Sequence, residues 1–197
     1  MAALADAGLT AYHAVKKAAP ALYPGTRVVV IGAGGLGHIG IQSLKALTPA
    51  EVIVVDPSEP ALELARSFGA DHTVPADGKH VDQVLELTAG QGAEVVIDFV
   101  GERGAERDAW QMTRRAGSHF VVGYGGTVEV PTIDVISTER NVIGNLVGTY
   151  NDLAELMALA AQGKVTLHTR TYPLDAVNDA MDDLDGGRLQ GRGILVP

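Results

Sequence analysis

The sequence contains no cysteine, which excludes disulfide bonds and thiolate metal ligands. Basic residues are in the minority, with 15 Lys and Arg against 24 Asp and Glu and a formal net charge of −9. Because a phosphate backbone is bound by clustered Lys and Arg, this scattered minority argues against a nucleic-acid partner. No stretch approaches the roughly 18 consecutive apolar residues of a membrane span, and residues 1–6 lack the basic start of a signal peptide. We therefore expect a cytoplasmic protein that binds neither membrane nor nucleic acid.

Short β-branched runs alternate with segments of helical spacing along most of the chain. Six strands are expected, at residues 27–31, 52–55, 72–74, 94–98, 119–122 and 141–144. Helices are expected at residues 3–18, 36–47, 59–68, 81–87, 107–114 and 152–161. This alternation predicts an α/β fold: a doubly wound, parallel, six-stranded sheet with helices on both faces. The tail differs, with an extended segment at 172–174, a helix at 175–184 and a last strand at 193–196.

The strongest motif, G-x-G-x-x-G, lies between the first expected strand and its helix. It reads Gly32-Ala33-Gly34-Gly35-Leu36-Gly37. Gly32 permits a tight turn, Gly34 lets the backbone approach a pyrophosphate, and Gly37 lets the helix pack closely on the strand. The helix N-terminus then offers N–H groups and a partial positive charge to phosphates. The motif, in this context, predicts a dinucleotide site.

Asp56 ends the second expected strand, 19 residues after Gly37. A carboxylate in this place can accept hydrogen bonds from the ribose hydroxyls of NAD and repel the extra phosphate of NADP. The other interpretation is a turn-forming Asp in Asp56-Pro57-Ser58. No Arg follows directly, the nearest being Arg66, so NAD is favoured over NADP.

Several further segments, in order along almost the whole chain, complete a resemblance. They are Asp6-Ala7-Gly8-Leu9-Thr10-Ala11-Tyr12, Gly69-Ala70-Asp71, Asp98-Phe99-Val100-Gly101, Val122-Gly123, Gly163-Lys164-Val165 and Gly191-Arg192-Gly193. Together with the glycine motif, they resemble the medium-chain dehydrogenase/reductase superfamily. Within it, the chain looks most similar to NAD-dependent zinc-type alcohol dehydrogenases that act on secondary alcohols.

The resemblance implies a division into three parts. Residues 1–24 would be a linking helix, 25–169 an NAD-binding Rossmann domain, and 170–197 a return segment of a GroES-like catalytic domain. That catalytic domain supplies most zinc ligands and the proton relay in the family, and this chain does not contain it. Zinc is therefore expected in the full-length enzyme only, and the return strand at Ile194, Leu195 and Val196 is expected to lack sheet partners.

Site residues follow from the resemblance one by one. Asp6 would be a zinc ligand, or else a helix cap; Thr10 would be catalytic, lying against the nicotinamide, or else bonded to its own backbone. Leu36 would pack on the nicotinamide ring, and the other coenzyme-binding positions would be Phe99, Val100, Gly123, Tyr124, Leu146 and Val147. Ordinary core or sheet-edge packing is the competing interpretation of these. Arg192 would bind the pyrophosphate, unless it is a plain surface residue.

The expected function is hydride transfer between NAD and an alcohol or ketone, with a homo-oligomer as the expected assembly. Two alternatives stay open: a non-catalytic NAD-binding module, and a zinc-free quinone or enoyl reductase of the same superfamily. Ala61 departs from the family, since many relatives carry Lys or Arg there against the adenosine ribose. The six histidines show no metal-binding spacing.

Overall fold

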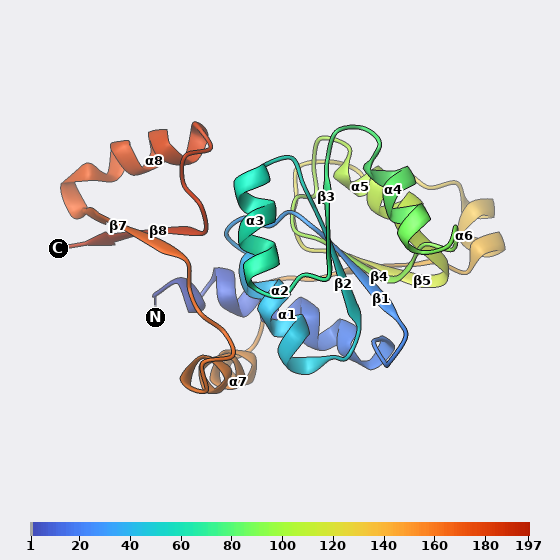
Figure 1. Cartoon of the computed structure of the whole chain (residues 1–197), viewed down its shortest axis with the longest axis horizontal. Helices are drawn as coiled ribbons and strands as arrows, with labels where there is room; N and C mark the ends of the chain where they lie inside the picture. Colours follow the sequence, from blue (N-terminus) through green and yellow to red (C-terminus); the bar gives the residue numbers. More distant parts are fainter. Residues whose placement is uncertain (1) are drawn as a thin grey trace.

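The centre of the molecule is a parallel β-sheet flanked by helices (Figure 1). The computed structural model describes residues 2–197. The sheet strands are β1 (Arg27–Ile31), β2 (Glu51–Asp56), β3 (His72–Pro75), β4 (Ala93–Asp98), β5 (Thr113–Val121) and β6 (Asn141–Gly144). Their spatial order is β3-β2-β1-β4-β5-β6, and every pairing is parallel. The predicted doubly wound six-stranded sheet is confirmed, and its strand order reverses between β1 and β4, where such folds bind ligands.

Helices follow the strands as the alternation requires. They are α1 (Ala7–Ala18), α2 (Gly37–Leu47), α3 (Glu59–Ser67), α4 (His80–Leu87), α5 (Ala105–Met112), α6 (Thr132–Thr138), α7 (Tyr150–Ala161) and α8 (Val177–Asp185), with a short 3₁₀ turn, η1, at Ala2–Leu4. Within residues 2–197, none of the helices combines the length and apolar character that crossing a bilayer demands.

The two faces of the sheet carry separate cores. In β1, Val28 and Val30 pack with α1, α2 and α3, while Val29 and Ile31 pack with α4 and α5. Successive side chains of a strand point to opposite faces, so a strand buried on both faces is apolar at every position. This explains why β1 and β2 appear in the sequence as uninterrupted β-branched runs.

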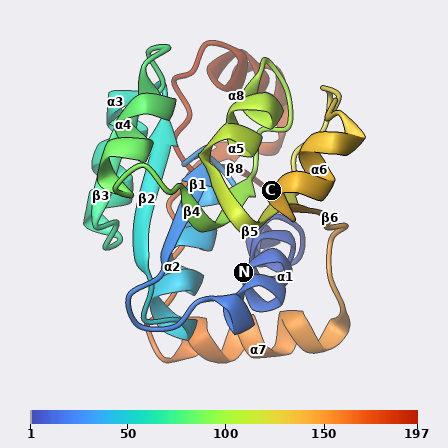
Figure 2. The ribbon, with the colours of Figure 1, turned by 90° about the vertical axis from the view of Figure 1, so that its right-hand side faces the viewer.

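A third apolar cluster fastens α7 to α1, and Figure 2 shows the two helices side by side below the sheet. Leu156 of α7 is fully buried there, and a side chain added at Gly8 of α1 would meet its Cδ2 at 2.9 Å. The close approach of the two helices therefore depends on a large residue on α7 opposite a glycine on α1.

Three local features differ from the expectations. The helix expected at 3–18 is interrupted near Asp6, so that η1 precedes α1. The strand β5 starts at Thr113, immediately after α5, with irregular pairing to β4 that shifts register between Ala93 and Val95. Helix α6 was not expected, because its seven residues are fewer than the roughly 11–18 over which an apolar periodicity can be recognised.

The end of the chain forms a second, smaller sheet. Strands β7 (Thr169–Pro173) and β8 (Arg192–Val196) pair in parallel with α8 as their crossover, and this unit lies apart from the main sheet (Figure 1). The expectation that the last strand lacks sheet partners is wrong: Ile194, Leu195 and Val196 pair with Thr171, Tyr172 and Pro173. The neighbouring β-strand comes from the chain itself, because the helix between them is long enough for a parallel crossover.

The α1–α7 contact supplies a test of the packing. We expect Leu156→Ala to lower the free energy of unfolding by about 2–5 kcal/mol, because it leaves a cavity in a fully buried cluster. Met157→Ala, one position along the same helix at a side chain that is 40% exposed, should change it by less than about 1 kcal/mol. Urea unfolding followed by circular dichroism measures both; equal losses for the two variants would contradict the assignment.

Candidate functional site

The glycine motif forms the turn from β1 into α2. Gly32 has φ +89°, a conformation that side chains disfavour, and a Cβ on Gly37 would overlap the carbonyl oxygen of Gly32. A Cβ on Gly34, by contrast, would have none of the described atoms within 4 Å, so this side of the turn is open. The geometry therefore has the tight turn, the close helix–strand packing and the exposed backbone that a bound pyrophosphate requires.

The N-terminus of α2 has no side-chain cap. Helices α3 and α7 are capped by the side chains of Ser58 and Thr149, whereas the N-cap residue of α2 is Leu36, which offers no polar side chain. The first N–H groups of a helix carry a partial positive charge and need partners. In α2 the N–H groups of His38 and Ile39 already donate to the carbonyl oxygens of Gly34 and Leu36, so an anion at the glycine turn would be held by the partial positive charge and by the N–H groups ahead of His38.

Asp56 connects the turn to the next strand. It is 9% exposed; its Oδ2 accepts a hydrogen bond from the N–H of Ala33 at 2.7 Å, and its Oδ1 accepts one from the N–H of Ser58 at 2.8 Å. The turn-forming role considered from the sequence is therefore present, and a bond to the glycine turn accompanies it. Because a carboxylate has about four acceptor positions, it keeps capacity for a ligand hydroxyl.

Two cavities open on either side of Val100 at the carboxyl ends of the strands. The first, of about 370 Å³, is lined by Gly32, Asp56, Pro57 and Val100 among others, and we call it the Asp56 cavity. The second, of about 380 Å³, we call the Thr10 cavity. It brings together nine of the residues selected from the sequence: Asp6, Thr10, Leu36, Phe99, Val100, Gly123, Tyr124, Leu146 and Val147.

Val100 separates the two cavities, and we call this residue the ridge. Its backbone is fixed by Asp98. This fully buried residue accepts hydrogen bonds at Oδ1 from the N–H groups of Val100 and Gly101, both at 2.9 Å. A Cβ on Gly123 would overlap the backbone of Val100, so the loops after β4 and β5 are in direct backbone contact. The ridge is therefore a rigid part of the sheet edge.

The far wall of the Thr10 cavity is more open. Tyr124 and Leu146 are 92% and 87% exposed, and Val147 has φ +47°, which is uncommon for a β-branched residue. Residues held in such conformations cluster at ligand sites. These side chains line the cavity without being part of the core, so the competing interpretation of ordinary packing does not describe them.

Arg192 stands over the glycine turn. A Cβ on Gly35 would meet its Cδ at 2.7 Å, and its Nη2 lies 3.6 Å from Oδ2 of Asp6. The two charged residues come from opposite ends of the chain and meet across the mouth of the site. Arg192 is thus placed where a guanidinium could reach phosphates bound at the turn.

Thr10 and Asp6 are less specialised in the structure than the resemblance implies. The Thr10 hydroxyl donates to the carbonyl oxygen of Asp6 at 2.7 Å, which is the local bond considered as its alternative, although Thr10 also lines the cavity. The Asp6 side chain is 76% exposed and makes no cap bond to α1, so the capping interpretation is wrong.

The described residues do not form a metal site by themselves. Among residues 2–197 there is no group of three or more His, Cys, Asp or Glu side chains that could hold a metal ion. Asp6 is the one residue that the resemblance assigns to zinc, and a single carboxylate facing a guanidinium is not a zinc site.

Some site residues were not selected from the sequence. His38 is fully buried behind the glycine turn, where Nδ1 donates to the carbonyl oxygen of Gly34 at 2.9 Å; burial lowers its pKa. In the Asp56 cavity, His80 pairs with Asp108 at 2.9 Å, and Glu102 and Arg103 complete the wall. Of these residues, only Glu102 and Arg103 could have been found from the sequence, because they directly follow the segment Asp98-Phe99-Val100-Gly101.

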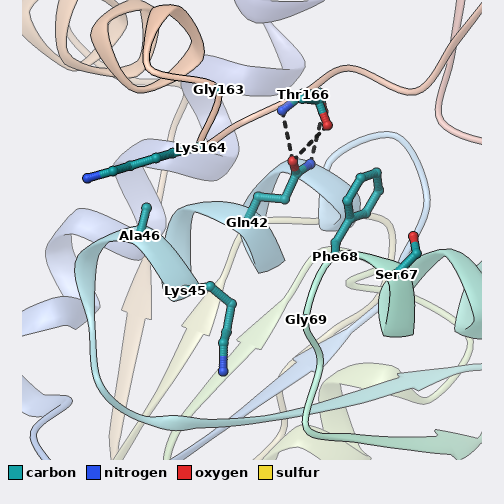
Figure 3. A pocket seen from close by; sticks show the side chains of 9 residues that line it. All are labelled: Gln42, Lys45, Ala46, Ser67, Phe68, Gly69, Gly163, Lys164 and Thr166. Carbon is teal, nitrogen blue, oxygen red and sulfur yellow. Dashed lines mark hydrogen bonds between the residues drawn. The ribbon is translucent and has the colours of Figure 1, made fainter.

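Another hollow lies elsewhere, beside α2 (Figure 3). Its volume is about 630 Å³, and Gln42, Lys45, Phe68, Lys164 and Thr166 are among the residues that line it. None of the predicted coenzyme-binding, catalytic or metal-binding residues lines it, although Gly69, Gly163 and Lys164 of the resemblance segments do. It is a shallow surface depression.

The site as a whole suits an elongated ligand with an anionic middle. Its two ends would occupy the Asp56 and Thr10 cavities, and its centre would cross Val100 below Arg192 and beside the N-terminus of α2. A dinucleotide has this shape and charge.

Comparison with known proteins identifies the family of the chain. The sequence profile of the family described as "Zinc-binding dehydrogenase" matches residues 35–162. An NAD-dependent alcohol dehydrogenase of Sulfurisphaera tokodaii is 37% identical over 200 residues, and a D-arabinose 1-dehydrogenase (NADP(+)) of Saccharolobus solfataricus is 33% identical over 201. Both alignments span 100% of this chain and 57% of the relative.

Among solved structures, the alcohol dehydrogenase of Aeropyrum pernix superposes with a TM-score of 0.98 at 50% identity. The alignment covers 100% of this chain and 57% of that one, so the chain spans little more than half the length of the proteins it matches. With the resemblance confirmed over the whole chain and the profile matched over its larger part, the chain belongs to the zinc-binding dehydrogenase family.

Proposed function

We propose that this chain is the coenzyme-binding part of an NAD-dependent alcohol dehydrogenase. The observation that carries the proposal is the junction at Val100, where two cavities meet beside an open helix N-terminus and under Arg192. The glycine turn and Arg192 would hold the pyrophosphate, and the nicotinamide would occupy the Thr10 cavity.

The choice of NAD depends on Asp56. Its carboxylate lies at the wall of the cavity that would take the adenosine, where it would accept hydrogen bonds from the ribose hydroxyls. A phosphate on the same ribose would meet this negative charge, and Ala61 supplies no cation to offset it. One relative is named for NADP, so family membership alone does not favour NAD. The argument for NAD is the carboxylate of Asp56.

This chain's own contribution to the reaction is positioning. Bound NAD would accept a hydride from the alcohol carbon. Phe99, Val100 and Leu36 would keep water from one face of the ring, and the backbone at Gly123 and Val147 would fix its orientation. Thr10 lies in the same cavity, and we propose that its hydroxyl faces the reacting atoms. No step through zinc is assigned to the chain, because its residues do not form a zinc site.

The remainder of the proposal concerns the whole protein. We infer a small alcohol or ketone substrate, secondary or of broad range, and a zinc centre completed by a GroES-like domain. In that protein residues 1–24 would link the domains, 25–169 bind NAD, and 170–197 return to the catalytic domain. Exposed apolar side chains on helix α6, such as Ile133 and Ile136, support a homo-oligomer. We propose that the whole protein is cytoplasmic.

Calorimetric titration with each coenzyme tests the site. We expect NAD to bind more tightly than NADP, and Asp56→Asn to weaken NAD binding about tenfold, because it removes a charge-assisted hydrogen bond, while NADP binding is unchanged or improved. Asp71→Asn is the matched control, since the carboxylate of Asp71 likewise accepts a backbone N–H, that of Val52, but at the opposite end of β2. An unaltered ratio of the two affinities in Asp56→Asn would rule out this role.

A second titration tests the ion pair across the mouth of the site. Asp6→Asn should tighten NAD binding about two- to fivefold, because an exposed carboxylate no longer competes with the phosphates for Arg192. Asp185→Asn, on the exposed surface of α8, is expected to have no effect. Weaker binding by Asp6→Asn would show that Asp6 itself contributes to the coenzyme site.

A turnover assay separates the coenzyme-binding part from a complete enzyme. With NAD, zinc and a secondary alcohol, this chain alone should form no reduced coenzyme above background, while still binding NAD. Ordinary turnover, followed by the absorbance of the reduced nicotinamide, would show that these residues suffice for catalysis.

A further inference from the structure

One buried polar side chain in the core of α2 is not explained by the site. Gln42 is 6% exposed, and three of its four hydrogen bonds join it to Thr166, 124 residues away in the sequence. Its Nε2 donates to the carbonyl oxygens of His38 at 2.8 Å and Thr166 at 2.9 Å. Its Oε1 accepts from the N–H of Thr166 at 2.8 Å and from the Thr166 hydroxyl at 3.1 Å, as Figure 3 shows.

This bonding arrangement is specific to an amide. The amides of Asn and Gln, like the peptide group, present an N–H donor and a carbonyl acceptor on the same carbon. Gln42 uses both on the backbone of one residue, as a neighbouring strand would. An apolar residue of similar size would leave the backbone N–H and carbonyl of Thr166 without these partners, which would lower the free energy of unfolding. The amide therefore fixes Thr166 relative to α2.

Thr166 is close to the start of the terminal unit. Two residues further on, the carbonyl oxygen of His168 accepts the backbone N–H of Arg192 at 3.0 Å. The preceding Gly191 has φ +70°, and a Cβ there would overlap the same carbonyl oxygen. The position of His168 thus determines where the backbone of Arg192 lies.

The glycine turn is at the other end of this chain of contacts. The same helix α2 that carries Gln42 begins at Gly37, and the Arg192 side chain lies over Gly35. The terminal unit otherwise lies apart from the main sheet (Figure 1), and His38 adds only a longer contact, 3.4 Å from Nε2 to the N–H of His168. Gln42 is therefore the principal polar link between the helix that presents the turn and the segment that presents Arg192.

We infer that Gln42 is a positioning residue for the coenzyme: it holds the 166–168 segment so that Arg192 stands over the glycine turn. The inference rests on the proposed function, since it concerns how the same pyrophosphate would be bound. It assigns a role in binding to a residue that touches no part of the ligand site.

A double-mutant cycle on the full chain tests it, with NAD affinity measured by calorimetry. Arg192→Ala is expected to weaken binding about ten- to a hundredfold, through the loss of charge-assisted hydrogen bonds. Gln42→Ala should weaken it about five- to thirtyfold in the presence of Arg192, but less than about twofold in the Arg192→Ala background. Strong non-additivity of this kind is the result expected of a residue that acts through Arg192.

Two further variants guard against a general loss of structure. Ile41→Val, at the adjacent fully buried position of α2, should lower stability without any coupling to Arg192→Ala. Gln42→Glu keeps the acceptor for Thr166 but has no donor for its carbonyl, so it should show the same coupling if Gln42→Ala does not fold.

The outcomes are distinct. Equal effects of Gln42→Ala with and without Arg192, or coupling by Ile41→Val of the same size, would overturn the inference and leave the proposed coenzyme site intact. If the unaltered chain bound no NAD at all, the proposed function itself would fail.

Discussion

The close approach of two backbones, at the point where β1 turns into α2, is the constraint on which the other features depend. Gly37 packs against the carbonyl of Gly32 with no room for a side chain, and Asp56 holds the turn from the neighbouring strand through Ala33. This brings the uncapped start of α2 to the carboxyl edge of the sheet, between the two cavities. A side chain at Gly37 would push α2 away from β1. The partial positive charge of the helix N-terminus, the Val100 backbone and the Arg192 side chain would then no longer lie around the same point.

Features that depend on local sequence could be predicted. The strands β1 and β2 were identifiable because burial on both faces demands an apolar residue at every position, and the glycine motif because a turn of this shape admits few alternatives. Asp56 followed from its distance along the chain, since one βαβ unit has a nearly constant length. The residues of the Thr10 cavity came from the resemblance, and the structure brings them together around one space.

Features that depend on long-range contacts could not be predicted. The bonds of Gln42 to Thr166, and the pairing of Asp6 with Arg192, join segments that only the finished fold places side by side. Helix α6 is too short for its apolar residues to form a recognisable periodic pattern, so periodicity gives no sign of it. The pairing of β8 with β7 has a different reason: the sequence predicts the extended segment, the helix and the strand, but the resemblance places the partner of the last strand in the catalytic domain.

The site combines a rigid floor with a cover that is attached by few contacts. The floor, formed by the glycine turn and the loops after β4 and β5, is fixed by backbone contacts that exclude side chains and by the buried carboxylate of Asp98. The cover, which carries Arg192, is attached to this body through polar bonds and through Val165 and Leu167, which belong to the apolar cluster between α1, α2 and α7. A charged group adds most to affinity when it is already in place, because ordering it on binding costs conformational entropy. Buried hydrogen bonds far from the ligand can therefore govern how much of the guanidinium's interaction with phosphates is realised as binding.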